Sequence, residues 1–168
     1  MGHSTTNAGV CIMDEFKLDF SKLIKSTITY KLLDYEACVS YGETIRNYMS
    51  ELITEETEFL KDTGYDFPHN QSTLKEWDSR VLAENSYGAF SGTELVGVVS
   101  YIAADKSMCG LYVAPKYRGK GVGKTLAKMV LDNFDVENIN VVYTNKSAMG
   151  LYESLGYKVI PIFAMAKK

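Results

Sequence analysis

The stretch Leu111–Thr125 reads LYVAPKYRGKGVGKT. Its first four residues are apolar, as at the end of a buried strand. Pro115 ends this run because proline has no N–H to donate to a neighbouring strand. A glycine-rich turn and a helical pattern follow, and this order presents several unpaired backbone N–H groups to an anion. The stretch therefore predicts a loop that binds a phosphate-bearing cofactor.

Two familiar phosphate-binding loops do not fit this stretch. A P-loop that ends in Gly123-Lys124-Thr125 needs a glycine at position 118, where the chain has Arg118. The dinucleotide fingerprint needs a glycine or alanine at position 126 or 124, depending on where it starts, and these positions hold Leu126 and Lys124. The pattern that remains is Arg-x-x-Gly-x-Gly, made by Arg118, Gly121 and Gly123.

Composition narrows the classes of protein. A chain of 168 residues suits one domain, and a net charge of −3 disfavours a general nucleic-acid binder. The positive charge gathers in residues 116–128, which suits a local anion site. Three cysteines without a short spacing and only two histidines argue against a disulfide framework and a metal site, so no metal is expected.

The longest apolar run, residues 95–104, is far shorter than the roughly 20 residues that span a bilayer. We therefore expect no membrane contact. The N-terminus lacks the apolar core of a signal peptide, and a cytoplasmic, reducing compartment is the simplest interpretation.

Hydrophobic periodicity predicts a single-domain α/β (α+β) fold. Its central sheet would be mixed and mostly antiparallel, with about six to seven strands flanked by helices. Residues 1–26 are expected to form an N-terminal extension that is partly disordered, and residues 27–168 the domain. The predicted strands are 27–33, 87–90, 95–104, 108–113, 138–144 and 157–164, and the predicted helices are 35–60 with a second helix starting at Thr54, 72–85, 122–134 and 147–155.

A second motif supports the loop assignment. Residues 145–157 read NKSAMGLYESLGY. Together with Arg118, Gly121 and Gly123, this segment resembles the two signature motifs of the GNAT superfamily of N-acyltransferases, in the expected order and on the expected elements. The resemblance implies a GNAT-like fold with a sheet splayed around its central strands, and acetyl-coenzyme A as the cosubstrate.

In this family the loop amides hold the pyrophosphate of coenzyme A, and the preceding strand offers main-chain groups to the pantetheine arm. A residue at the position of Asn145 also contacts that arm. The alternative is that Asn145 is simply a residue of the loop-to-helix turn. The cofactor-binding residues that the resemblance implies are Leu111, Tyr112, Val113, Arg118, Gly119, Lys120, Gly121, Val122, Gly123, Lys124, Asn145, Ser147 and Tyr152.

The resemblance also implies that Tyr152 is the general acid that protonates the departing thiolate, although its place in an apolar helical stripe would equally suit a core tyrosine. Many members carry a glutamate where this chain has Met108 or Cys109. Proton removal would then run through ordered water or through a carboxylate elsewhere, such as Glu84. Cys109 fits a buried structural cysteine better than a nucleophile, because no histidine is paired with it in the pattern.

The sequence therefore predicts an N-acetyltransferase that transfers the acetyl group of acetyl-coenzyme A to a primary amine, by direct attack in a ternary complex. A non-catalytic sensor of acyl-coenzyme A is the alternative. The acceptor would be a small molecule or a peptide amine. Residues 159–166 are apolar enough to pair across a homodimer interface or to form a buried strand. An acidic cluster suits a cationic acceptor but also an ordinary solvated helix face, and consists of Glu51, Glu55, Glu56 and Glu58.

Overall fold

A computed structural model describes residues 27–61 and 83–160 of the chain. The predicted N-terminal extension, most of the predicted helix at 72–85 and the end of the predicted last strand lie outside these residues. Within them, residues 83–85 form a turn, and residues 157–160 have no regular structure where a strand was predicted.

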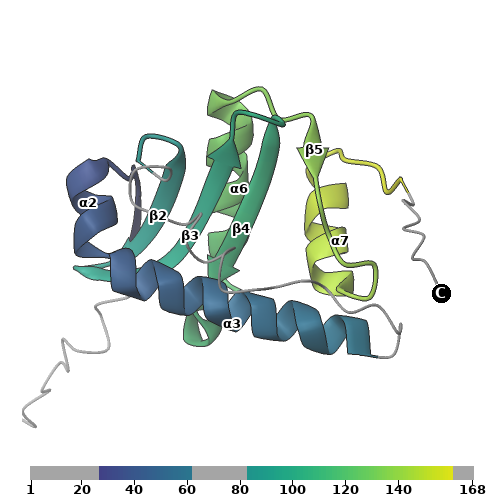
Figure 1. Ribbon diagram of the computed structural model, residues 1–168, viewed down its shortest axis with the longest axis horizontal. Helices are drawn as coiled ribbons and strands as arrows, with labels where there is room; N and C mark the ends of the chain where they lie inside the picture. Colours follow the sequence, from purple (N-terminus) through teal and green to yellow (C-terminus); the bar gives the residue numbers. More distant parts are fainter. Residues whose placement is uncertain (1–26, 62–82, 161–168) are drawn as a thin grey trace, which may run out of the picture.

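The described chain forms one mixed sheet in the order β1-β2-β3-β4-β5 (Figure 1). The first four strands form an antiparallel meander, and β5 lies parallel to β4. This confirms a mixed, mostly antiparallel sheet, with five strands in the described residues instead of about six to seven. The strands are β1 (Ile28–Leu32), β2 (Ser86–Ser91), β3 (Glu94–Ile102), β4 (Ser107–Val113) and β5 (Asn138–Ile139).

A β-bulge interrupts β4 at Gly110. The register runs from the pair Val98–Tyr112 to the pair Ser100–Cys109, so β4 carries one residue more than β3 between them. Gly110 lies in this extra segment with φ of 60°, a left-handed conformation that glycine adopts without a steric cost. Such a bulge bends the strand that carries it.

The bend explains why β5 is short. β5 pairs with β4 only through Ser107–Asn138 and Met108–Ile139, directly before the bulge. Figure 1 shows the two segments diverging from this point. The prediction of a strand over 138–144 is therefore wrong beyond Ile139, because no described strand lies in register with the chain there. The expected splay of the sheet is confirmed.

The helices follow the predicted positions with two differences. Tyr41 separates α2 from α3, so the predicted helix 35–60 is divided in two. The second helix predicted at Thr54 is wrong, since α3 continues through it and the Thr54 hydroxyl donates to the carbonyl of Ser50 at 2.9 Å. The helices are α2 (Tyr35–Ser40), α3 (Gly42–Leu60), α6 (Val122–Asn133) and α7 (Lys146–Glu153), and a 3₁₀ turn spans Pro115–Tyr117.

Helices cover both faces of the sheet. One core packs α6 against the sheet through Leu126, Ala127 and Val130, all fully buried. The other core lies under α2 and α3 and contains Ile45 and Met49. A fully buried apolar side chain of this size contributes about 1.5–3 kcal/mol. The two cores hold β4 between α3 and α6, with α7 beyond the splay (Figure 1).

Candidate active site

Beyond Met108, the edge of β4 that faces the splay carries main-chain groups with no described strand beside them. The N–H of Ala114 donates to the carbonyl of Val96 at 2.9 Å. Main-chain groups alternate in direction along a strand, so those of Tyr112 also face β3 while those of Leu111 and Val113 face away. Within the described chain, β5 reaches only Met108 on that side. The predicted role of Leu111 and Val113 thus has a suitable geometry, and that of the Tyr112 main chain does not.

The Tyr112 side chain lies on the face of the sheet that α3 covers. Its ring is 2% exposed and stacks on Tyr48 at 4.6 Å between centroids. Its hydroxyl donates to the Glu51 carboxylate. Burial, and then the hydrogen bond to Glu51, raise the pKa of Tyr112 well above its usual value. Tyr112 therefore fixes α3 against β4.

The loop that leads into α6 has the backbone shape of an anion site. Gly119 and Gly121 adopt φ of 69° and 84°, and a Cβ added at either would meet no atom within 4 Å. These glycines are therefore required by backbone conformation. The first helical bond runs from the N–H of Thr125 to the carbonyl of Gly121 at 3.0 Å. The N–H groups of Val122, Gly123 and Lys124 precede it and point out of the helix end.

The cationic side chains around this loop differ in how far they are neutralised. Lys116 forms an ion pair with Glu94 at 3.0 Å. Lys120 donates to the carbonyl of Lys116 at 2.9 Å, and no partner of Lys124 lies in the described part of the chain. The loop therefore offers an anion its amides and the charges of Lys120 and Lys124.

Arg118 connects the loop to α3. Its Nη2 donates to Glu55 at 2.8 Å, and its Nε donates to the carbonyl of Val113 at 2.7 Å. The guanidinium also lies over the Tyr112 ring, 5.2 Å from the centroid. Arg118 was predicted to bind the cofactor. The structure shows its side chain engaged by protein groups, so its observed part is to position the loop against α3 and β4.

Tyr152 lies on α7, the helix beyond the splay of β4 (Figure 1). The ring is partly buried against the core between α6 and the sheet, and its hydroxyl makes no hydrogen bond to a described residue. Burial, and then the electrostatic influence of Glu56 and of Cys109, raise the pKa of Tyr152 to about 12. The phenol therefore keeps its proton at neutral pH.

Cys109, which influences Tyr152 electrostatically, is itself a protonated thiol. Burial, and then Asp105, raise its pKa to about 12. A thiol without its thiolate is a poor nucleophile, in agreement with the structural interpretation of Cys109.

Glu56 of α3 is near enough to Tyr152 to raise the pKa of that phenol, whereas sequence reasoning placed Glu56 only in a general acidic cluster. It occupies a stripe at steps of three and four residues that faces the sheet, with Ile45, Met49, Leu52 and Leu60 as the other members. Burial, and then the charge of Glu55, raise the pKa of Glu56. A carboxylate in an otherwise apolar stripe was the signal in the sequence.

Three other predicted residues are placed as follows. Asn145 is the N-cap of α7, and its Oδ1 accepts from the N–H of Ala148 at 3.0 Å, which leaves its amide NH₂ for a ligand. Ser147 is exposed in the first turn of that helix. Glu84 lies in an exposed turn with φ of 63°, where its N–H donates to the carbonyl of Leu33 at 2.8 Å. No described contact links Glu84 to Tyr152, and its role as a base stays a prediction.

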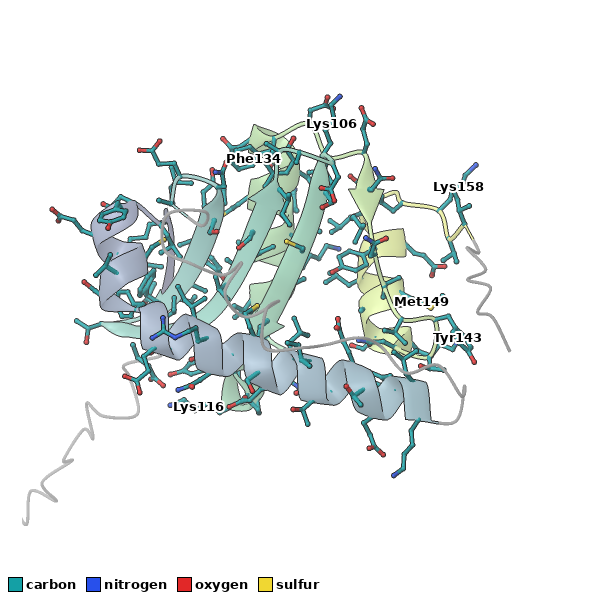
Figure 2. All side chains as sticks on the ribbon, viewed as in Figure 1. Lys106, Lys116, Phe134, Tyr143, Met149 and Lys158 are labelled. Carbon is teal, nitrogen blue, oxygen red and sulfur yellow. The ribbon has the colours of Figure 1, made fainter. Side chains whose placement is uncertain are left out.

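Figure 2 shows how the side chains of the surrounding elements are distributed. Lys116 and Tyr143 lie at the same side of the molecule as α3, Met149 lies on α7, and Lys106 is at the far end of β4. Within residues 27–61 and 83–160, no three metal-binding side chains come together. No helix in those ranges has the length and apolar character needed to cross a membrane.

Residues 47–157 match the model of the Acetyltransferase (GNAT) family. The chain belongs to this family. The matched segment contains both predicted motifs and most of α3.

Two curated proteins of Bacillus subtilis are similar over part of the chain. UPF0157 protein YqkA is 34% identical over 112 residues, which cover 60% of this chain and 31% of YqkA. The SPbeta prophage-derived uncharacterized N-acetyltransferase YokL is 29% identical over 104 residues, 54% of this chain and 59% of YokL. The chain thus aligns with less than two thirds of either relative.

Solved structures share the fold of this GNAT protein. One is a predicted acetyltransferase of Clostridium acetobutylicum with acetyl-CoA, with a TM-score of 0.58 and 12% sequence identity. The superposition covers 84% of this chain and 96% of the Clostridium chain. Aminoglycoside N-acetyltransferase AAC(6')-Iy in complex with CoA has a TM-score of 0.57 and 15% sequence identity. The superposition covers 84% of this chain and 95% of the AAC(6')-Iy chain. YjaB of Escherichia coli has a TM-score of 0.55 and 23% sequence identity, and the superposition covers 80% of this chain and 84% of the YjaB chain.

Proposed function

We propose that this GNAT acetyltransferase transfers the acetyl group of acetyl-coenzyme A to a primary amine, by direct attack within a ternary complex. The observation that supports this best is the continuous path from the α6 loop along the exposed edge of β4 to Tyr152. Val113 at the loop and Cys109 pair with Gly97 and Ser100 of β3, which are three residues apart, or about 10 Å along a strand. An anion site and a proton donor thus lie at the two ends of one strand.

The residues present fit coenzyme A. The amides of residues 119–124, with Lys120 and Lys124, would hold the pyrophosphate, because charged hydrogen bonds of this kind contribute about 1.5–3 kcal/mol each. The main-chain groups of Leu111 and the N–H of Val113 would pair with the pantetheine arm, and the Asn145 amide lies at the facing helix. The cosubstrate supplies an activated acetyl thioester.

Tyr152 would act as the general acid. A phenol that stays protonated at neutral pH can give its proton to a departing thiolate, since the transfer is coupled to the departure of the sulfur. The hydroxyl has no hydrogen bond to a described residue, so it is available to a ligand. Its place beside the end of the β4 edge supports this role over that of a core tyrosine.

The acceptor would approach from the α3 side. Glu51 and Glu55 of α3 are engaged by Tyr112 and Arg118, and Glu56 is near enough to Tyr152 to raise its pKa. A carboxylate in this position favours a cationic acceptor, which suits a small-molecule or peptide amine.

Measurement of free thiol released from acetyl-coenzyme A tests the proposal. The panel would contain spermidine, kanamycin, L-lysine and a peptide with a free N-terminus, and acetylated products would be identified by mass. Release that depends on one of these amines supports the transferase. Binding of acetyl-coenzyme A in calorimetry without release for any amine would favour the sensor, the alternative suggested by Met108 and Cys109 where many members have a glutamate.

A further inference from the structure

The side chain of Arg118 joins the loop before α6 to two other elements. Its Nε donates to the carbonyl of Val113, at the end of β4, at 2.7 Å, and its Nη2 donates to Glu55 of α3 at 2.8 Å. The guanidinium also lies over the Tyr112 ring, 5.2 Å from the centroid. A planar group with donors in a fixed fork holds two acceptors in one geometry. Arg118 therefore fixes the start of the loop relative to both β4 and α3.

The glycine turn of this loop reaches other elements through Arg118. Residues 118–121 are Arg-Gly-Lys-Gly, so two of the four have a side chain. The other one, Lys120, donates to the carbonyl of Lys116 at 2.9 Å, within the same stretch of chain. A Cβ added at either glycine would meet no described atom within 4 Å. The position of the turn amides thus depends on Arg118 at one end and on the start of α6 at the other.

The α3 side of this link is itself anchored to the sheet. The Tyr48 hydroxyl donates to the carbonyl of Leu95 at 2.5 Å, and the Tyr48 ring stacks on Tyr112 of β4 at 4.6 Å between centroids. The Tyr112 hydroxyl donates to Glu51, about one helical turn before Glu55. Spacings of three and four residues place Tyr48, Glu51 and Glu55 on one face of α3. Glu55 therefore holds the guanidinium from a helix face that contacts β3 and β4.

The β4 side of the link limits the exposed edge of that strand. Leu111 and Val113 direct their main-chain groups away from β3, but the Val113 carbonyl already accepts from Arg118. On the other side of Leu111, the bulge at Gly110 interrupts the strand. The N–H and carbonyl of Leu111 and the N–H of Val113 are the groups that this edge offers a strand-like ligand. This short track ends where the loop begins.

We propose that Arg118 is a positioning residue that holds two subsites at the distance that coenzyme A spans: the loop amides for the pyrophosphate and the β4 track for the pantetheine arm. The inference rests on the proposed binding of coenzyme A. Glu55 is the second member of the link, because it fixes the guanidinium on α3. A ligand that occupies both subsites gains from their fixed spacing, whereas a ligand that occupies only one does not.

A direct contact between Arg118 and the pyrophosphate is the competing role. It would require the guanidinium to give up charge-assisted hydrogen bonds to Val113 and Glu55. The two roles predict different results for Arg118→Lys, since lysine binds phosphate as a point charge but lacks the fork. They also differ in sign for Glu55→Ala. Loss of this carboxylate would free the guanidinium for a phosphate and strengthen binding in the direct role, but it would weaken binding in the positioning role.

The test measures by calorimetry the binding of coenzyme A and of adenosine 3′-phosphate 5′-diphosphate, which is coenzyme A without the pantetheine arm. The variants are Arg118→Met, Arg118→Lys and Glu55→Ala. Each is expected to bind coenzyme A about 10-fold more weakly than the wild type, and the armless nucleotide within about 2-fold. The matched control is Glu94→Ala, because Glu94 also pairs with a cation beside the loop, Lys116 at 3.0 Å, but belongs to β3. It should keep the wild-type ratio of the two affinities.

The possible failures are distinct. Equal losses for both ligands in Arg118→Met with recovery in Arg118→Lys would overturn the proposal in favour of a direct phosphate contact. Equal losses in all three variants, with lower melting temperatures, would reduce Arg118 to a structural role. Unchanged coenzyme A affinity, or a Glu94→Ala variant that matches Glu55→Ala, would also overturn the proposal.

The wild type separates this inference from the proposed function. A wild type that binds coenzyme A but releases no thiol from acetyl-coenzyme A with any amine would overturn the acetyl transfer, and the positioning role of Arg118 would still be decided by the ratio of the two affinities. A wild type that binds neither ligand would overturn both.

Discussion

Gly121→Ala should destabilise the protein, and Gly123→Ala should not. Gly121 has φ of 84°, whereas Gly123 lies in the first turn of α6, where an added Cβ would meet Val113 Cγ2 at an ordinary 3.6 Å. A left-handed conformation costs an L-residue roughly 1–2 kcal/mol. Both substitutions restrict the unfolded chain equally, a gain of about 0.4–1 kcal/mol that cancels between them. The difference between the two variants is therefore about 1–2 kcal/mol.

Thermal and urea unfolding would measure this difference. For a chain of this size, 1 kcal/mol corresponds to about 2–4 °C, so Gly121→Ala should melt about 2–8 °C below Gly123→Ala. Neither added methyl is blocked by a neighbour, so a clash cannot produce the gap. Equal stability of the two variants would refute the conclusion that this loop depends on a left-handed residue at position 121. Calorimetry should also show weaker coenzyme A binding by Gly121→Ala, because the amide directions change.

Three further outcomes are expected. Tyr152→Phe should leave the melting temperature within about 2 °C of the wild type in calorimetric scans, because the hydroxyl makes no hydrogen bond to a described residue; a large loss would indicate a structural hydroxyl. Glu56 has a raised pKa in the fold, so its charged form opposes folding above that pKa, and the penalty disappears as pH falls through it. Glu56→Gln should therefore raise the melting temperature at pH 7 and reduce the gain in stability on acidification, and a fall at pH 7 would contradict this. Breaking the half-exposed Arg118–Glu55 pair should show a coupling of about 0.2–1 kcal/mol in a double-mutant cycle by urea unfolding, with a larger effect on coenzyme A affinity, and no change in affinity would exclude the positioning role.

Local patterns in the sequence were sufficient to predict the meander and the α6 loop. Alternation and turn residues defined β2, β3 and β4, and Gly121 and Gly156 have the positive φ expected at a loop and at a helix end. The two motifs identified the family because each lies on a separate, strongly patterned element.

The length of β5 could not be predicted from its own residues. Residues 138–144 are apolar and β-branched, but a strand requires a neighbour in register, and the bulge at Gly110 bends β4 away after Met108. Gly110 was the relevant signal, since an isolated glycine inside a strand pattern often marks a bulge.

The role of individual acidic side chains also required the structure. Glu51, Glu55 and Glu58 have the same charge and lie on one helix, yet each has a different partner: Tyr112, Arg118 and Lys61. Glu56 instead acts electrostatically on Tyr152. All these relations except the local pair with Lys61 join residues more than fifty positions apart. Helical spacing could single out Glu56 as facing the core, but only the tertiary packing shows what it meets.

Amine-dependent release of thiol from acetyl-coenzyme A, compared between the wild type and Tyr152→Phe, tests the central claim most directly. We expect release by the wild type only when an amine is present, and a kcat about 100-fold lower for Tyr152→Phe with unchanged acetyl-coenzyme A affinity. Equal rates for the two proteins would contradict Tyr152 as the acid. Tight acetyl-coenzyme A binding without release for any amine would contradict the transferase.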